Sequence, residues 1–170
     1  MVRRFAAGAA LAALMVLAPG AGAVQAEEEA AAVEGVSLAH LAGRWQGQGT
    51  VTPPSGPSES FRCVITYFMS DGSSQMKQNV RCQNANFKFD AATRLQISGA
   101  QVTGVWMDNV YALNGTVSGK ITDKGFEVQL NGRFFQAKMT VVGSGCEQQV
   151  RVVPGRADYM KEMAAVLKKC

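Results

Sequence analysis

Short stretches in which apolar and polar residues alternate, separated by turn residues, make up most of this chain. The alternation is clearest in GFEVQLNG, which runs from Gly125 to Gly132. A period of two residues is typical of β-strands that have one buried and one exposed face. Turn residues such as Asn131-Gly132 recur at the intervals of a β-meander. The sequence therefore predicts a mainly β fold from Gly47 to about Val153.

The intervals between the turns correspond to about eight to ten short strands. Because most connections are short, neighbouring strands are expected to pair antiparallel, in an up-and-down order. A twisted sheet with that many strands tends to close, which also removes its exposed edges. Glycines within the strands, such as Gly104 and Gly115, suit the bends of a small barrel. We therefore expect a closed antiparallel β-barrel.

Helical patterns flank the predicted barrel. Ser37 is a suitable N-cap for a short N-terminal helix that includes Leu38 and Leu41. Near the other end of the sequence, apolar residues recur at helical spacing, namely Met160, Met163, Ala164 and Leu167. This segment is predicted to form a C-terminal helix that packs on the barrel.

Residues 1–26 have the layout of a secretory signal peptide. Arg3 and Arg4 precede an uncharged apolar run and small residues, and cleavage is expected after Ala23 or Ala26. Residues 27–36 are acidic and are interpreted as a flexible leader, so that residues 37–170 form a single domain. An uncleaved membrane anchor is the alternative. The short apolar run favours export to the periplasm, or to the extracellular space.

The net charge indicates no preference for an anionic partner once the signal peptide is removed. The chain has 17 Lys and Arg against 13 Asp and Glu, and loss of Arg3 and Arg4 leaves 15 against 13, a net charge of +2. This small excess gives no argument for binding to nucleic acid or to an anionic membrane surface. No second apolar stretch is long enough to span a membrane, so no transmembrane segment is expected after signal removal.

Four cysteines follow the predicted signal peptide: Cys63, Cys82, Cys146 and Cys170. An even count in an oxidising compartment indicates two disulfides. In a hairpin around SDGSS, the register that pairs Cys63 with Cys82 also places Ile65 opposite Val80. We therefore predict the disulfides Cys63–Cys82 and Cys146–Cys170. A zinc site is the alternative, but the chain has no C-x-x-C spacing and one histidine.

The stretch GRWQGQG places Trp45 among glycines where the first strand is expected to begin. Gly43-Arg44-Trp45 resembles the G-x-W with which lipocalins begin their first barrel strand, and GRWQGQG is similar to the start of the nitrobindins. Both are calycin-type barrels, and the wider pattern resembles uncharacterised secreted proteins of α-proteobacteria. The resemblance implies that Trp45 closes one barrel end beneath an arginine of the last strand, for which Arg151 is the candidate.

The resemblance to nitrobindins does not extend to their cofactor. Nitrobindins bind haem through a histidine far along the chain, whereas the one histidine here, His40, precedes the first strand. His40 is interpreted as a surface or capping residue. We expect no haem and no other cofactor.

The sequence contains no motif for catalysis. It lacks G-x-S-x-G, H-E-x-x-H and a phosphate-binding glycine loop. Its scattered carboxylates are interpreted as turn formers; they include Asp71, Asp90, Asp108 and Asp123. We expect no catalytic residues, no metal site and no enzyme activity.

A binding interior is the remaining functional hypothesis. Small barrels are either packed solid or hold one small ligand. The candidate lining residues combine polar-tipped aromatic rings with aliphatic side chains and a flexible methionine; they are Tyr67, Val102, Trp106, Tyr111, Phe135 and Met139. The prediction is an exported, soluble and monomeric protein that binds a small apolar ligand or an envelope component.

Two alternative functions remain open from the sequence. A periplasmic interaction protein, such as a protease inhibitor, would insert the leader 27–36 into an active-site cleft. A small outer-membrane barrel would turn its apolar face to lipid, because alternation alone does not show which face lies outside. The predicted C-terminal helix and the absence of clear aromatic girdles favour a barrel in water.

Overall fold

The computed structural model describes residues 37–156 and 160–170. The predicted signal peptide and leader, residues 1–36, lie outside this range. The described residues form ten β-strands and two short 3₁₀ turns, η1 (Ala39–Leu41) and η2 (Asp71–Ser73). The strands are β1 (Gly43–Thr52), β2 (Glu59–Met69), β3 (Gln75–Gln83), β4 (Lys88–Ser98), β5 (Gln101–Asp108), β6 (Leu113–Thr122), β7 (Gly125–Gly132), β8 (Gln136–Ser144), β9 (Glu147–Pro154) and β10 (Glu162–Lys168).

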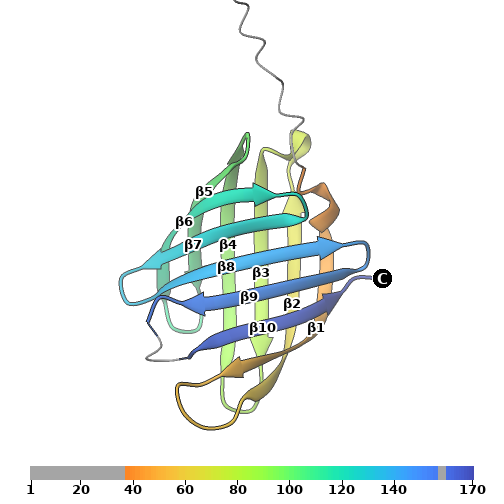
Figure 1. Cartoon of the computed structure of the whole chain (residues 1–170). Coiled ribbons are helices and arrows are strands. Elements are labelled where there is room, and N and C mark those ends of the chain that lie inside the picture. The colour runs from red at the N-terminus through yellow and green to blue at the C-terminus, as the bar shows by residue number, and fades with distance from the viewer. Residues whose placement is uncertain (1–36, 157–159) are drawn as a thin grey trace, which may run out of the picture. The chain divides into compact units, whose positions relative to one another are not determined.

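All ten strands belong to one closed antiparallel barrel (Figure 1). Each strand pairs with its neighbours in the sequence, and β1 pairs with β10 to close the barrel. The closing ladder runs from Gln46 opposite Lys168 to Thr52 opposite Glu162. Closure gives the backbone groups at both edges of the sheet a partner. The predicted antiparallel up-and-down barrel is therefore confirmed.

The predicted C-terminal helix is wrong, because residues 162–168 form strand β10. Met163, Ala165 and Leu167 alternate along this strand, and the last two are buried. The sequence of this segment thus fits both a helical and a strand period. The segment forms a strand because it pairs with β1 and β9, and a helix here would leave one edge of each of these strands unpaired.

The predicted N-terminal helix is not seen, and only the 3₁₀ turn η1 forms in its place. The Ser37 hydroxyl accepts a hydrogen bond from the Ala39 amide at 3.1 Å. The chain then leaves the turn at once, because Gly43 has a φ of +109° and begins β1. Leu38 and Leu41 are nevertheless buried, so the turn contributes to the core.

Two strand glycines allow neighbouring strands to bend close together. A Cβ atom at Gly47 would overlap the Val166 carbonyl oxygen of β10, and one at Gly104 would overlap the Arg94 carbonyl oxygen of β4. A side chain at either position would push paired strands apart. Gly47, two residues after Trp45, therefore allows the barrel wall to curve at this point.

Side chains from all ten strands form one hydrophobic core inside the barrel. Its largest fully buried members include Trp45, Tyr67 and Phe126. Alternate residues of the strands face outward, as in β3, where the burial pattern alternates along its whole length. Among the described residues, no helix has the length and hydropathy needed to cross a membrane.

Both predicted disulfides are present. Cys63 and Cys82 lie directly opposite each other on β2 and β3, with Cα atoms 4.1 Å apart, and the same register pairs Ile65 with Val80. Cys146, between β8 and β9, is joined to Cys170 with Cα atoms 5.4 Å apart. Two disulfides indicate an oxidising compartment.

Candidate binding site at the open end of the barrel

The barrel has two ends, which we name the closed end and the open end. The closed end contains η1, the start of β1, the end of β10 and the turns 70–74, 99–100, 123–124 and 145–146. The open end contains the connections 53–58, 84–87, 109–112 and 133–135, and the described part of 155–161. The connections alternate between the ends because all neighbouring strands are antiparallel.

Trp45 and η1 seal the closed end. The Trp45 indole N–H donates to the Leu41 carbonyl oxygen at 2.7 Å, and both side chains are fully buried. The Lys169 ammonium lies 4.7 Å from the Trp45 ring centre and donates to the His40 carbonyl oxygen at 2.8 Å. Leu41 also packs against β8, where a Cβ atom at Gly143 would lie 2.6 Å from its Cδ2 atom. An apolar plug and a cation–π contact therefore cover this end.

Arg151 does not lie over Trp45, contrary to the prediction. It is on the outer face of β9, where its guanidinium donates to both carboxylate oxygens of Glu162 at 2.8 and 2.9 Å. The hydrogen bond and charge of Glu162 raise the pKa of Arg151, and the same hydrogen bond lowers the pKa of Glu162. The cation over Trp45 is Lys169, which follows β10. The error arose because β10 was predicted to be a helix, which made β9 the last strand.

Four of the six predicted lining residues are buried in the core: Tyr67, Val102, Trp106 and Met139. Phe135 lies at the open end and packs edge-on against Trp106, with ring centres 6.0 Å apart. Tyr111 is not in the interior, since it lies in the connection 109–112 and is 58% exposed. The cause is local, because β6 begins at Leu113 and the residues before it form a turn.

The open end leaves part of the core accessible. Phe61 and Phe87 form an edge-on pair there, with ring centres 5.7 Å apart. Partly buried residues that pack against the core are concentrated at this end, whereas Met69 and Ile97 lie toward the closed end. We call the residues at the open end the apolar rim: Val51, Phe87, Phe89, Leu113, Leu130, Phe135, Met160 and Met163.

Trp106 lies next to the apolar rim and has an unused hydrogen-bond donor. Its ring packs on two glycines: a Cβ atom at Gly115 would lie 2.7 Å from Nε1, and one at Gly132 would lie 2.9 Å from Cζ2. The Nε1 atom is buried and has no hydrogen-bond partner among the described residues. An unsatisfied buried donor costs about 1–3 kcal/mol. This N–H is therefore a candidate contact for a ligand.

Three polar side chains form a second group of buried hydrogen-bonding atoms. The Gln78 amide donates to the Tyr67 hydroxyl at 3.3 Å. Burial raises the pKa of Tyr67, and the amides of Gln78 and Gln148 partly offset this effect. The Gln148 amide makes no hydrogen bond of normal geometry to the described residues. Neither glutamine was predicted as a site residue, although the predicted hairpin register pairs Tyr67 with Gln78, and Gln148 is in phase with Val150.

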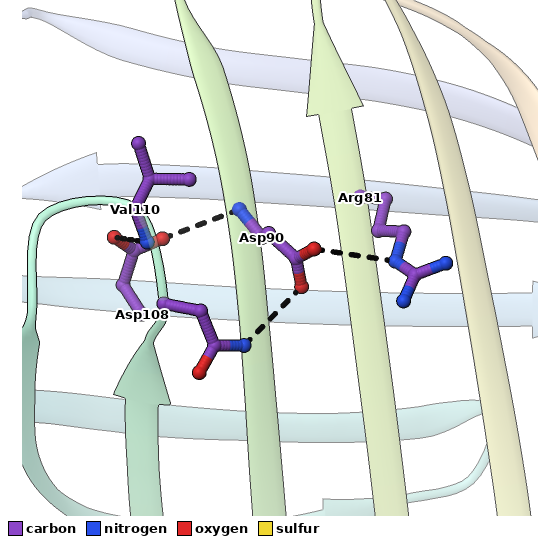
Figure 2. Close-up of polar contacts among 5 residues, drawn as sticks. Arg81, Asp90, Asp108 and Val110 are labelled. Carbon is purple, nitrogen blue, oxygen red and sulfur yellow. Dashed lines mark hydrogen bonds and ion pairs between the residues drawn. The ribbon is translucent and has the colours of Figure 1, made fainter.

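Asp108 fixes the connection 109–112 at the open end (Figure 2). Its Oδ1 atom accepts a hydrogen bond from the Val110 amide at 3.1 Å. The same atom accepts a second one from the Tyr111 amide at 2.7 Å. Its Oδ2 atom accepts one from the Asp90 amide at 3.2 Å. The carboxylate is almost fully buried. These bonds hold the backbone of Val110 and Tyr111 against β4.

Asp90 adds a second set of contacts between the same elements. Its carboxylate accepts a hydrogen bond from the Asn109 side chain at 3.3 Å and pairs with Arg81 at 3.3 Å (Figure 2). The sequence predicted Asp90 in a turn, but it lies within β4. Asp90 therefore links β3, β4 and the start of the connection 109–112.

The connection 84–87 is fixed in a similar way. The Asn84 side-chain oxygen accepts hydrogen bonds from the amides of Asn86 at 2.7 Å and Phe87 at 2.8 Å. The side-chain amides of Asn84 and Asn86 donate to Glu59 at 3.0 and 2.8 Å. Phe87 of the apolar rim is therefore held by a turn with its own hydrogen-bond network.

Other parts of the described chain offer less chemistry. No group of three His, Cys, Asp or Glu residues within the described ranges is arranged to hold a metal ion. His40 lies at the closed end, with its ring nitrogens 3.1 Å from the Ser37 carbonyl oxygen and 3.3 Å from that of Lys124. Two hollows of about 340 and 380 Å³ lie on the outer wall and are lined mainly by polar or charged side chains.

The fold places the protein among closed antiparallel β-barrels. No known family profile and no curated protein matches the chain. Among solved structures, 22 chains match. One is the crystal structure of Rv2717c from M. tuberculosis, with a TM-score of 0.63 and 14% identity, covering 78% of this chain and 94% of that one. At this identity the likeness shows the barrel fold alone, and the resemblance to calycins stays a prediction.

Proposed function

We propose that this protein is an exported binding protein, without catalytic activity, that takes up a small apolar ligand or an apolar group of an envelope component at the open end of its barrel. The observation that carries the proposal is the accessibility of the core at one end. The apolar rim is partly exposed there, and the buried Trp106 N–H beside it lacks a partner among the described residues.

The chemistry of the open end suits a mostly apolar ligand with one hydrogen-bond acceptor. Phe135 offers apolar contact beside the Trp106 ring, Leu113 belongs to the same apolar rim, and a ligand oxygen could accept the indole N–H. Asp108, the buried carboxylate nearby, already accepts three backbone hydrogen bonds. We therefore assign Asp108 to holding the connection 109–112 rather than to acid–base chemistry.

The outer wall supports a barrel surrounded by water rather than by lipid. Its exposed positions include charged residues on several strands, among them Lys77, Arg94, Lys120 and Lys138. A lysine or arginine at the middle of a bilayer costs about 2–4 kcal/mol on a lipid-facing barrel wall. Together with the disulfides, this supports a location in the periplasm.

The two tryptophans provide an internal test of the proposed site. Trp45 lies at the closed end and Trp106 at the open end, and the chain has no others. Trp45→Phe leaves Trp106 as the single fluorophore, and Trp106→Phe leaves Trp45. Each protein would be titrated with a bromine-terminated undecanol, because bromine quenches an indole that it contacts.

The expected result is saturable quenching of the protein that retains Trp106 and little quenching of the one that retains Trp45. Native mass spectrometry of the unaltered protein, purified from its own periplasm, should show a bound small molecule. Equal or absent quenching of the two proteins, together with no co-purified mass, would contradict the proposal.

A further inference from the structure

We propose that the open end docks on the surface of an anionic lipid bilayer, through a patch of exposed apolar and basic side chains. The apolar part consists of Val110, Tyr111 and Phe134, which are 41%, 58% and 67% exposed. All three lie in connections at the open end. The inference does not rest on the proposed ligand, because it concerns side chains outside the core.

The exposure of these side chains is built into the fold. Val110 and Tyr111 have their backbone amides bound by the buried Asp108 carboxylate. The connection that carries Phe134 is three residues long, and Gly132 donates a backbone hydrogen bond to the Phe135 carbonyl oxygen across it at 2.7 Å. The loops therefore present apolar groups to water in fixed positions, which is typical of an interaction site.

Basic side chains at the same end supply the charge complementarity. Lys88, Arg133 and Lys161 are exposed. The Arg133 guanidinium lies 5.0 Å from the centre of the Phe134 ring, so a cation and an exposed aromatic group form one unit. Lys88 and Lys161 have no acidic partner among the described residues.

The described acidic groups at the open end are already engaged. Glu59 accepts hydrogen bonds from the side chains of Asn84 and Asn86. Asp90 pairs with Arg81, and Glu162 pairs with Arg151. Asp108 is buried. Hydrogen bonds from neutral amides leave the negative charge of Glu59 in place. Among the described residues, the accessible charges without an oppositely charged partner are nevertheless mainly positive, and they point to an anionic partner.

A bilayer surface fits this combination better than an aqueous protein surface does. Aromatic side chains favour the headgroup region, where one part of the ring is apolar and another is wet. Each lysine or arginine near an anionic bilayer strengthens the attraction about fivefold. At the closed end, by contrast, the described turns consist of small, polar and charged residues such as Asp123 and Lys124, and the exposed apolar residues nearest to them, Phe68 and Val166, lie within strands.

The test is co-sedimentation of the full exported chain with vesicles. Vesicles of phosphatidylcholine alone would be compared with vesicles that also contain phosphatidylglycerol. We expect binding to the anionic vesicles, and a loss of that binding as salt rises from about 0.05 M to about 0.5 M. Equal binding to both vesicle types, or binding that salt does not change, would overturn the proposal.

Matched variants locate the docking surface. Tyr111→Ser with Phe134→Ser should lower the partition coefficient about tenfold, while Phe68→Ser with Val166→Ser, at exposed positions nearer the closed end, should leave it within about twofold. Lys88→Glu with Arg133→Glu should lower it about tenfold or more, whereas Lys77→Glu with Lys124→Glu, which changes the net charge equally, should have a smaller effect.

Circular dichroism of each variant shows that the barrel is intact before vesicles are added. Equal losses in the test and control pairs would overturn the assignment to the open end. A concentration-dependent dimer that Phe134→Ser abolishes, without any vesicle binding by the unaltered chain, would also overturn it, because a second copy would then cover the patch. Quenching of Trp106 by the brominated alcohol is measured separately, so failure of one proposal is distinguishable from failure of the other.

Discussion

The two ends of the barrel use similar apolar residues in opposite ways. At the closed end, Trp45 and Leu41 are fully buried, a lysine covers the Trp45 ring, and the Cys146–Cys170 disulfide lies at the same end. At the open end, Phe87 and Phe135 are partly buried and Tyr111 is exposed. A barrel gains stability by covering its core, and we therefore place the proposed binding site at the end that leaves apolar groups accessible.

The two tryptophans show the same contrast at the level of a single hydrogen bond. The Trp45 N–H has a backbone acceptor at 2.7 Å, whereas the Trp106 N–H has none among the described residues. A native core rarely leaves a buried donor unsatisfied. The Trp45 N–H is therefore used within the fold, whereas the Trp106 N–H has no such use among the described residues.

The largest expected effect comes from removing the closed-end plug. Trp45→Ala should destabilise the protein by about 4–5 kcal/mol, because it leaves a large cavity and breaks the hydrogen bond to Leu41. Trp106→Ala should cost clearly less, because it also removes an unsatisfied donor from the core. Urea unfolding of both variants measures the difference, and an equal or larger cost for Trp106→Ala would break the comparison.

The next largest effect concerns the disulfide at the closed end. Cys146→Ser with Cys170→Ser should lower the free energy of unfolding by roughly 3 kcal/mol, because the closed loop spans 24 residues. Hydrogen exchange should then increase first in β10 and in the start of β1. Faster exchange in the connections 84–87 and 109–112 instead would show that the two ends are not independent.

A smaller effect is expected at the open end from the carboxylate that fixes its loop. Asp108→Asn should cost about 2 kcal/mol, because the neutral amide places an N–H₂ group where an oxygen accepted backbone hydrogen bonds. The backbone amides of Val110 and Tyr111 should lose protection from hydrogen exchange. Asn109→Ala is the control, since it removes a contact to Asp90 and leaves the Asp108 carboxylate in place.

The smallest effect tests the cation over Trp45. Lys169→Met should lower stability by about 0.5–1 kcal/mol, because the cation–π contact and the exposed hydrogen bond to the His40 carbonyl oxygen are lost while the apolar stem remains. Lys168→Met, on the neighbouring residue, should leave the melting temperature nearly unchanged. Similar shifts for the two variants would remove Lys169 from the description of the closed end.

The sequence predicted correctly those parts of the fold that are set by short-range patterns or by two independent signals that agree. The hairpin of β2 and β3 was predicted in its correct register, because one alignment joined Cys63 to Cys82 and also matched Ile65 with Val80. A slip of one residue would have reversed the faces of both strands. The closed antiparallel barrel followed from the repeated short turns.

The errors occur where distant pairing decides the structure. Met163 and Leu167 fit a helical spacing, and the ladder that makes their segment a strand is formed with β1, at the other end of the chain. That single error also misplaced the cation over Trp45. Tyr111 was misplaced for a different reason. Asp108 was interpreted as a turn former, but the turn that its side chain holds reaches as far as residue 112, so Tyr111 lies before β6 rather than within it.

The polar part of the candidate site was not predicted, because an apolar pattern does not show which polar residues of a strand are buried. Gln148 is fully buried and lies two residues before Val150, so the two-residue period of β9 predicts that its side chain faces inward. Whether its amide finds a partner depends on side chains from other strands, among them Tyr67 of β2. The sequence order does not bring β2 and β9 together before the barrel closes.

Barrel closure also has a consequence for synthesis. Gln46 of β1 pairs with Lys168 of β10, although the two residues are 122 positions apart in the sequence. One edge of β1 therefore stays unpaired until nearly all of the following chain is present in the same compartment. In a secreted protein, this delay would keep the polypeptide unfolded during translocation. It would also expose a truncated product to aggregation or proteolysis.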